Sequence, residues 1–293
     1  MQTPNCNCVG TIAALLGGGY GNIMGEHGFA VDNVISMRVV TASGDILTAS
    51  KTSNPELFWA LRGAGPNFGV VTSATVNAFP APATADRTSW IMSVTFAPSQ
   101  IEKVAQTIND LPLLPEQVVY LVLTNSGDAS NTPMVLVTGF LHKGNETSGR
   151  KAYAPLYALK PLTETSAVTP YTGWNAANDG FCSPGGRKPA FSTTINSMKA
   201  RTWPKIWNLY TDFQKKPGAQ NSAVLIERYN LTKAQSVPAG SAAMQEALRR
   251  EAFAQAIVIP WYDDASFDGD AVAFGSKVRD IWSFSSSAKV NPT

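Results

Sequence analysis

The chain is poor in histidine and cysteine, the residues that most often carry metal and triad chemistry. Its 293 residues include two histidines, His27 and His142, and three cysteines, Cys6, Cys8 and Cys182. This set completes no zinc site and makes a histidine-based triad a poor hypothesis, so we expect no metal centre. Cys6 and Cys8 lie too close in sequence for an unstrained bridge, and an odd number of cysteines cannot all pair within one chain.

An excess of one charge and long apolar runs are also lacking. The net charge is +2 with both signs interspersed, so the composition does not favour nucleic acid as a partner. No stretch approaches the roughly 18 apolar residues of a membrane span. No signal peptide precedes Cys6, which taken literally indicates an intracellular protein, and the localisation stays open. Hydrophobic residues make up 44% of the chain, enough for a sizeable core.

The chain does have a glycine-rich segment near its start. Residues 6–21 read CNCVGTIAALLGGGYG, with two thiols at one end and four glycines at the other. Three consecutive glycines leave a piece of backbone without side chains, which a flat or charged ligand can approach closely. The same run is typical of a tight bend, so the glycines alone leave both interpretations open.

The order of elements predicts an α+β fold in two parts, with the Pro/Ala segment 79–83 as the boundary. The first part, residues 1–80, has predicted strands at 34–41, 46–49 and 70–76 and a helix that starts after Asn54. The second part, residues 81–293, is predicted to be an antiparallel sheet covered by helices. Its predicted strands are 90–96, 118–124, 134–141, 222–229 and 254–261, its helices are 99–111, 145–156, 203–213 and 268–282, and residues 161–189 are predicted to be loop-rich.

Several motifs in residues 1–80 occur together in a characteristic order. They are Cys6-x-x-Val9-Gly10, the glycine run 17–21, Gly28, Asp32-Asn33 and the segments 54–63 and 67–72. Together they resemble the berberine bridge enzyme-like branch of FAD-linked oxidases, in the vanillyl-alcohol oxidase/p-cresol methylhydroxylase superfamily, and especially its fungal members of secondary metabolism. The resemblance implies that residues 1–80 are the C-terminal part of an FAD-binding domain and that residues 81–293 are the substrate domain.

The resemblance also implies a cofactor site. Cys6 matches the position whose sulfur bonds covalently to the flavin, and this is the interpretation that the motif favours. Cys8 is the second candidate for the anchor, and an inert or incidental thiol at Cys6 is the alternative. The main chain lining FAD would come from Val9, Gly10, Gly17, Gly18, Gly19, Gly21 and Gly28. For the glycines a structural bend remains the alternative, and both interpretations can hold at once.

Two further residues match family positions near the substrate. Tyr20 matches an aromatic residue that contacts substrate, although it can equally be a ring packed in the core. Glu227 falls on the strand that carries the catalytic base, where burial would raise the pKa of its carboxyl and let it accept a proton from a substrate hydroxyl. The alternative is a glutamate that faces solvent or pairs with Arg228. We expect Tyr229 on the opposite face of a regular strand.

The implied activity is oxidation of a small metabolite by hydride transfer to FAD, with O₂ as acceptor. The family carries a further unit before the cysteine and a Tyr-x-Asn-Tyr segment near its end, so we expect a chain truncated at both ends whose full-length relatives are often secreted. Truncation keeps two alternatives open: a non-catalytic remnant or binding protein, and a flavin-independent enzyme that uses the substrate pocket alone. The substrate itself is not predicted.

Overall fold

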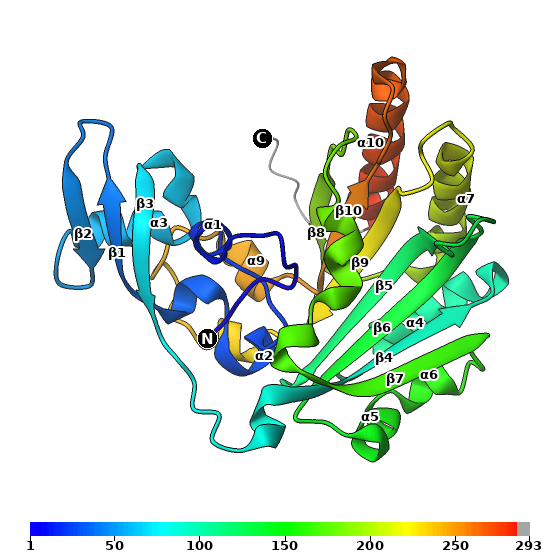
Figure 1. Cartoon of the computed structure of the whole chain (residues 1–293), viewed down its shortest axis with the longest axis horizontal. Helices are drawn as coiled ribbons and strands as arrows, with labels where there is room; N and C mark the ends of the chain where they lie inside the picture. Colours follow the sequence, from blue (N-terminus) through cyan, green and yellow to red (C-terminus); the bar gives the residue numbers. More distant parts are fainter. Residues whose placement is uncertain (286–293) are drawn as a thin grey trace.

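The computed structural model describes residues 1–285, and Figure 1 shows two β-sheets with helices packed against them. The smaller sheet has the strand order β2-β1-β3, and the larger sheet has the order β7-β4-β6-β5-β9-β10-β8. Neighbouring strands in both sheets are antiparallel. The fold is therefore α+β with an antiparallel sheet and helices, as predicted.

The smaller sheet is built from three short strands rich in β-branched residues. They are β1 (Val34–Val40), β2 (Ile46–Ser50) and β3 (Val70–Val76). Two helices, α1 (Thr11–Leu16) and α3 (Pro55–Ala64), belong to the same unit. They bury Leu15, Phe58 and Leu61 in one apolar cluster with Val39 of β1, and this burial holds the glycine run beside the small sheet.

The larger sheet has seven strands. They are β4 (Thr88–Phe96), β5 (Gln117–Asn125), β6 (Pro133–His142), β7 (Thr163–Pro170), β8 (Phe191–Ile195), β9 (Ala223–Tyr229) and β10 (Ala254–Ile259). Their apolar side chains alternate between the two faces, because successive strand residues point in opposite directions. Each face therefore needs its own cover.

Helices cover one face of the larger sheet. They are α4 (Ile101–Asp110), α5 (Glu146–Ala152), α6 (Ala154–Tyr157), α7 (Trp203–Gln214) and α10 (Asp268–Ser285). In α4 the buried residues are Ile101, Val104, Ala105 and Ile108, the spacing of one helix face. The helices α7 and α10 lie side by side in Figure 1. This layer holds the largest apolar core of the described residues.

The opposite face of the larger sheet packs against the segment that follows the glycine run. Three short helices lie on this side of the sheet: α2 (Met24–His27) from that segment, and α8 (Thr232–Gln235) and α9 (Glu246–Arg250) from later in the chain. Met24 and Phe29 pack with Val118 of β5, Phe140 of β6 and Tyr229 of β9. The start of the chain thus packs against the middle of the larger sheet, where the candidate site lies.

One expectation about the elements was wrong. Residues 161–189, predicted to be loop-rich, contain the strand β7 and two 3-10 helices, Tyr171–Gly173 and Ala176–Cys182. The strand was missed because it lies at the sheet edge, pairs with β4, and is mostly exposed and polar, so it lacks the apolar alternation of a half-buried strand. Within residues 1–285 no helix has both the length and the apolar character needed to cross a bilayer.

Candidate active site

A carboxylate on β9 lies at the centre of a polar cluster. Glu227 Oε2 accepts hydrogen bonds from Tyr229 OH at 2.8 Å and from Asn5 Nδ2 at 3.3 Å. Tyr120 of β5 is directly opposite Glu227 in the strand register, and its hydroxyl is 3.3 Å from the same Asn5 nitrogen. The neighbouring Arg228 donates instead to main-chain carbonyl groups at the end of α4. Glu227 therefore faces the start of the chain and is not paired with Arg228.

The expected orientation of Tyr229 was wrong. Residues two apart on a strand point to the same face, so Glu227 and Tyr229 lie together. The Tyr229 ring also contacts the rings of Tyr120 and Tyr20, with centroid distances of 6.2 Å and 5.6 Å. The signal for this pair was present in the sequence as the spacing of two along a strand.

The surroundings of Glu227 change its acidity. Burial raises the pKa of the Glu227 carboxyl above its usual value, although the hydrogen bonds from Tyr229 and Asn5 oppose the rise. Burial also raises the pKa of Tyr229 and of Tyr120, and the charge of Glu227 adds to both effects. Both phenols therefore remain protonated, and Tyr229 donates to the carboxylate, which binds a proton more tightly than a solvated glutamate does. The cluster is suited to accept a proton.

Tyr20 reaches the same cluster from the end of the glycine run. Its ring meets Phe29 edge-on at a centroid distance of 5.0 Å, and its hydroxyl accepts a hydrogen bond from Gln255 of β10. Burial raises the pKa of Tyr20 as well. A packed ring and a substrate contact both fit this position, so the role of Tyr20 stays a prediction.

The segment that carries Cys6 is fastened to this cluster by Asn5. The Asn5 amide donates to the Tyr229 hydroxyl at 2.8 Å, in addition to its contact with Glu227. Because Asn5 immediately precedes Cys6, the proposed flavin anchor and the carboxylate are linked through one residue. Sequence reasoning missed Asn5, since a single asparagine in a loop shows no spacing that relates it to β9.

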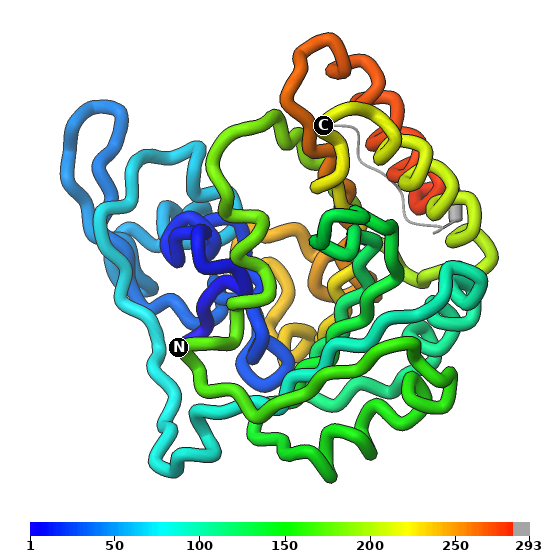
Figure 2. Tube along the Cα trace, turned by 45° about the vertical axis from the view of Figure 1, so that its right-hand side comes forward, coloured from blue at the N-terminus to red at the C-terminus, as the bar shows by residue number. Residues whose placement is uncertain are grey.

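A loop of the larger sheet holds the same segment in place. Residues 171–182 follow β7 and run beside the start of the chain (Figure 2). Four hydrogen bonds join them: one between Thr3 Oγ1 and Tyr171 OH at 3.1 Å, Asn175 Nδ2 to Pro4 O at 3.1 Å, Asn178 Nδ2 to Asn5 O at 2.7 Å, and Asn7 Nδ2 to Asp179 Oδ1 at 2.7 Å. These contacts were not predicted either, because they join segments about 170 residues apart.

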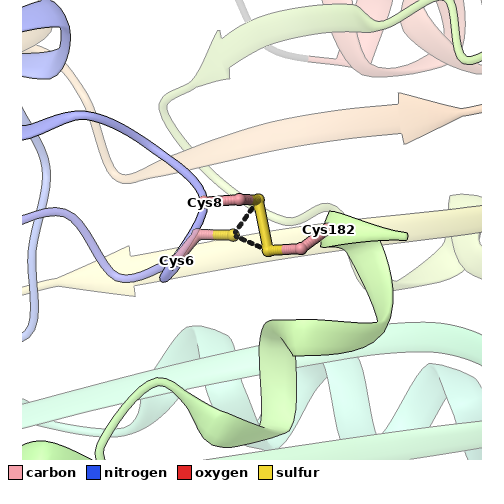
Figure 3. A group of neighbouring side chains, drawn as sticks. All are labelled: Cys6, Cys8 and Cys182. Carbon is pink, nitrogen blue, oxygen red and sulfur yellow. Dashed lines mark hydrogen bonds between the residues drawn. A yellow bond between two sulfur atoms is a disulfide. The ribbon is translucent and has the colours of Figure 1, made fainter. Parts of the chain in front are cut away.

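Three sulfur atoms meet where this loop ends (Figure 3). Cys8 and Cys182 form a disulfide, and Cys6 is the free cysteine. Cys6 Sγ lies 3.5 Å from Cys8 Sγ and 3.6 Å from Cys182 Sγ. Two of the three clustered sulfurs are bonded to each other, so the cluster presents one thiol rather than three metal ligands. The disulfide was not predicted, because 174 residues separate its cysteines.

A cavity of about 220 Å³ opens beside Cys6 and Val9. Asn22 contributes to its lining, as do the aromatic side chains Tyr171 and Trp174 of the loop. Asn22 Oδ1 also accepts a hydrogen bond from Tyr120 OH at 2.5 Å. The cavity is thus connected to the Glu227 cluster by a hydrogen bond, although Glu227 and Tyr20 do not line it.

The predicted cofactor glycines fall into two groups. A Cβ would clash with the chain itself at Gly19, Gly21 and Gly28, whereas the nearest atoms are 3.9 Å away at Gly10 and Gly17 and 3.4 Å away at Gly18. The first group is explained by close packing within the chain; at Gly21, for example, a Cβ would lie 2.0 Å from the carbonyl oxygen of Thr3. Gly10 and Gly17 are exposed and leave main chain accessible. Contact of any of these glycines with a cofactor stays a prediction.

The residues around Cys6 fit one end of a flavin. They offer a free thiol, exposed main chain at Val9 and Gly10, and a cavity with amide and aromatic walls. The cavity is smaller than the roughly 300–1,000 Å³ of pockets that enclose drug-sized ligands. The arrangement therefore suits the ring of a flavin rather than the whole dinucleotide.

Comparison with curated proteins gives relatives with one shared description. The chain is 31% identical over 244 residues to the FAD-linked oxidoreductase srdI of Neurospora crassa, covering 81% of this chain and 48% of that protein. It is 30% identical over 294 residues to the FAD-linked oxidoreductase hasG of Aspergillus fumigatus, covering 96% of this chain and 61% of that protein. The chain thus spans about half the length of the curated relatives it matches. No family model matches the chain.

Solved structures show the same fold. A chitooligosaccharide oxidase superposes with a TM-score of 0.77 at 20% identity, covering 99% of this chain and 62% of that one. A berberine bridge enzyme in complex with (S)-reticuline gives a TM-score of 0.75 at 14% identity, covering 96% of this chain and 57% of that one. At these identities the likeness establishes the architecture alone.

Proposed function

Because the chain belongs to the berberine bridge enzyme-like family of FAD-linked oxidoreductases, we propose that it oxidises a small metabolite at the Glu227 cluster. When bound, FAD supplies a hydride acceptor that O₂ can reoxidise. The observation that carries the proposal is a carboxylate of raised pKa that two hydrogen bonds hold beside three tyrosines. We also propose a role in secondary metabolism, which rests on the resemblance of the sequence motifs to fungal family members; the curated relatives described above are fungal FAD-linked oxidoreductases.

Glu227 is the proposed proton acceptor. A substrate hydroxyl donates a hydrogen bond to its carboxylate, and the proton moves to a carboxylate oxygen as the hydride leaves the substrate carbon. Tyr229 and Asn5 hold Oε2, so they fix the direction in which the other oxygen points. The substrate thereby loses two electrons and two hydrogens in total, and an alcohol becomes a carbonyl compound.

Cys6 is the proposed covalent anchor. It is the one cysteine outside the disulfide, and it borders the cavity that suits a flavin ring. A covalent bond there would keep the ring next to the residue, Asn5, that contacts Glu227. The N-terminal segment would thus hold FAD, the hydride acceptor, close to Glu227, the proposed base.

An absorbance spectrum of the purified 293-residue chain tests this proposal. We expect a yellow protein whose colour stays with the precipitate after acid denaturation. Cys6→Ser should release the pigment into the supernatant, whereas Asn7→Ser, the matched control in the same turn, should retain it. A protein that stays colourless after incubation with FAD would contradict the proposal and leave the two alternatives, a non-catalytic protein and a flavin-independent enzyme.

We also propose that the chain matures in an oxidising compartment. The disulfide between Cys8 and Cys182 supports this, because such bonds persist mainly in secreted proteins and in the secretory pathway. Asn145 is exposed and begins the acceptor pattern Asn-Glu-Thr. Expression in a fungal secretory host should therefore give a chain whose mass falls after glycosidase treatment, and an unchanged mass would argue against this route.

A further inference from the structure

The arrangement of the three sulfurs gives Cys182 two possible partners. Its Sγ is bonded to Cys8 and lies 3.6 Å from Cys6 Sγ, and the sulfurs of Cys6 and Cys8 are 3.5 Å apart (Figure 3). Cys6 and Cys8 come from one turn of the N-terminal segment, whereas Cys182 ends the 3-10 helix Ala176–Cys182. A thiol in contact with both sulfurs of a disulfide is placed to exchange with it.

We propose that the three cysteines undergo thiol–disulfide exchange, so that Cys8 is a second site at which the chain presents a free thiol. The thiolate of Cys6 attacks Sγ of Cys182; the Cys6–Cys182 bond forms as the Cys8–Cys182 bond breaks, and Cys8 leaves as a thiolate. One disulfide replaces another, so the step consumes neither oxidant nor reductant. The proton that Cys6 loses is matched by the one that Cys8 takes up.

The near-equal distances place Cys6 Sγ beside the sulfur–sulfur bond rather than along its axis. A side-chain rotation at Cys6 or Cys8 must therefore precede the attack, which proceeds along that axis. Cys8 is exposed and Cys6 is half-buried, so neither side chain is enclosed by the core. Exchange can thus occur while the main chain of the segment keeps its hydrogen bonds to Asn175 and Asn178.

Cys182 is the shared partner in both states. A Cys6–Cys8 bridge would close a strained ring, because the two residues are only two apart in sequence. The loop 171–182 therefore stays tied to the N-terminal segment in either state, and only the free thiol moves. The exchange itself does not depend on the proposed function, but bonding of a flavin at Cys6 would remove the attacking thiol and fix the disulfide at Cys8.

Alkylation of the 293-residue chain tests the exchange without any activity assay, and it is measured on the fraction of the protein that carries no attached flavin. The protein is treated with iodoacetamide under native conditions for increasing times, quenched with acid and digested with trypsin. The first lysine or arginine after Cys8 is Arg38, so both cysteines stay on one tryptic peptide, and fragment ions on either side of Asn7 tell them apart. We expect label on Cys6 in some chains and on Cys8 in others. Label confined to Cys6, or found on Cys182, would overturn the proposal.

Single substitutions give a second, independent test of the exchange. In the presence of oxidised glutathione, Cys8→Ser should lose both of its free thiols, because Cys6 takes the place of Cys8 on Cys182. Cys182→Ser, the matched control, should form no internal disulfide. Intact mass separates an internal bridge from bound glutathione. If Cys8→Ser keeps two thiols or takes up glutathione, Cys6 does not reach Cys182 and the proposal fails.

Discussion

Asn5 is the residue that brings the chemistry of the proposed site together. Its amide donates to Tyr229 at 2.8 Å and to Glu227 at 3.3 Å, and the next residue is Cys6. Hydrogen bonds to an ionised carboxylate favour the charged form and oppose the effect of burial. Asn5 therefore does two things at once, because it positions the segment and keeps the carboxylate available as a base.

Asn5→Leu should move the acidic limb of the kcat/KM profile to higher pH. The substitution removes a hydrogen bond that lowers the pKa of Glu227, so that pKa rises further above its usual value. Because the base works only when deprotonated, activity should begin to fail at a higher pH as the solution is acidified. Asn7→Leu, which removes a contact with Asp179 instead, should leave the limb in place. A limb unmoved by Asn5→Leu would exclude Asn5 from this role.

Glu227→Gln should lower activity and raise stability at neutral pH. Loss of a general base typically costs about 10²–10⁴-fold in rate. Burial raises the pKa of the Glu227 carboxyl, so the folded state disfavours its ionised form. Once the pH is above the pKa of Glu227 in the folded chain, each pKa unit of such a shift lowers the free energy of unfolding by about 1.4 kcal/mol. This loss of stability is absent below the pKa that Glu227 has in the unfolded chain, so the higher stability of Glu227→Gln should vanish at acidic pH. Urea unfolding at several pH values would show this, and a variant that is less stable at neutral pH would contradict it.

Strand pairing, at the scale of elements, explains which parts of the site the sequence predicted. The apolar run that opens β9 predicted a strand through Glu227, and the sequence pattern also predicted the positions of α4, α7 and α10. Tyr120 faces Glu227 only because β5 pairs with β9 in one register. That register is set by packing between distant segments, so the sequence did not show it.

The missed features share a physical cause. The disulfide and the contacts of residues 171–182 join segments that come together only after the large sheet has formed. Edge strand β7 was missed because its exposed polar side chains carry no hydrophobic signal. Motifs local in sequence, such as Cys6-x-x-Val9-Gly10, were the reliable part; the partners of those motifs were not.

A buried ion pair joins two short elements and supports a stability prediction. Arg249 of α9 donates to both carboxylate oxygens of Asp32 at 2.7 Å and 2.8 Å, and these side chains are 2% and 6% exposed. Removing one partner of a buried pair leaves an uncompensated charge, so Arg249→Met should cost about 3–5 kcal/mol of unfolding free energy. Arg250→Met, which breaks a surface pair with Glu246, should cost roughly 0–1 kcal/mol.

The double variant Asp32→Asn/Arg249→Met separates charge from packing. With both charges removed, the loss measured by urea unfolding should be smaller than the sum of the two single losses. Additive losses would show that the two side chains stabilise the chain independently. The pair would then not be what holds α9 against the 3-10 helix Ala30–Asn33, on which Asp32 lies.

At the scale of the whole molecule, the start of the chain is held to the large sheet by three kinds of contact. Aromatic and aliphatic side chains pack around Phe29 and Tyr229, amides bind residues 4–7, and a disulfide closes the contact. The disulfide differs from the others in acting on the unfolded chain, because it forbids conformations in which the two segments separate. Its cysteines are 174 residues apart, so the loop that it closes is long.

Cys182→Ser should therefore destabilise the chain by about 2–4 kcal/mol, the usual contribution of a disulfide, although strain can reduce the value for a long loop. Cys6→Ser leaves the disulfide intact and should change stability little.

Cys8→Ser shows whether Cys182 has one possible partner or two. If Cys6 replaces Cys8 on Cys182, the loop stays closed and the stability stays near that of the wild type. Urea unfolding of the oxidised proteins measures all three, and addition of a dithiol reductant should bring the wild type down to the level of Cys182→Ser. Equal losses for Cys8→Ser and Cys182→Ser would mean that Cys182 has one partner only, and that the N-terminal segment is secured by a single fixed bond.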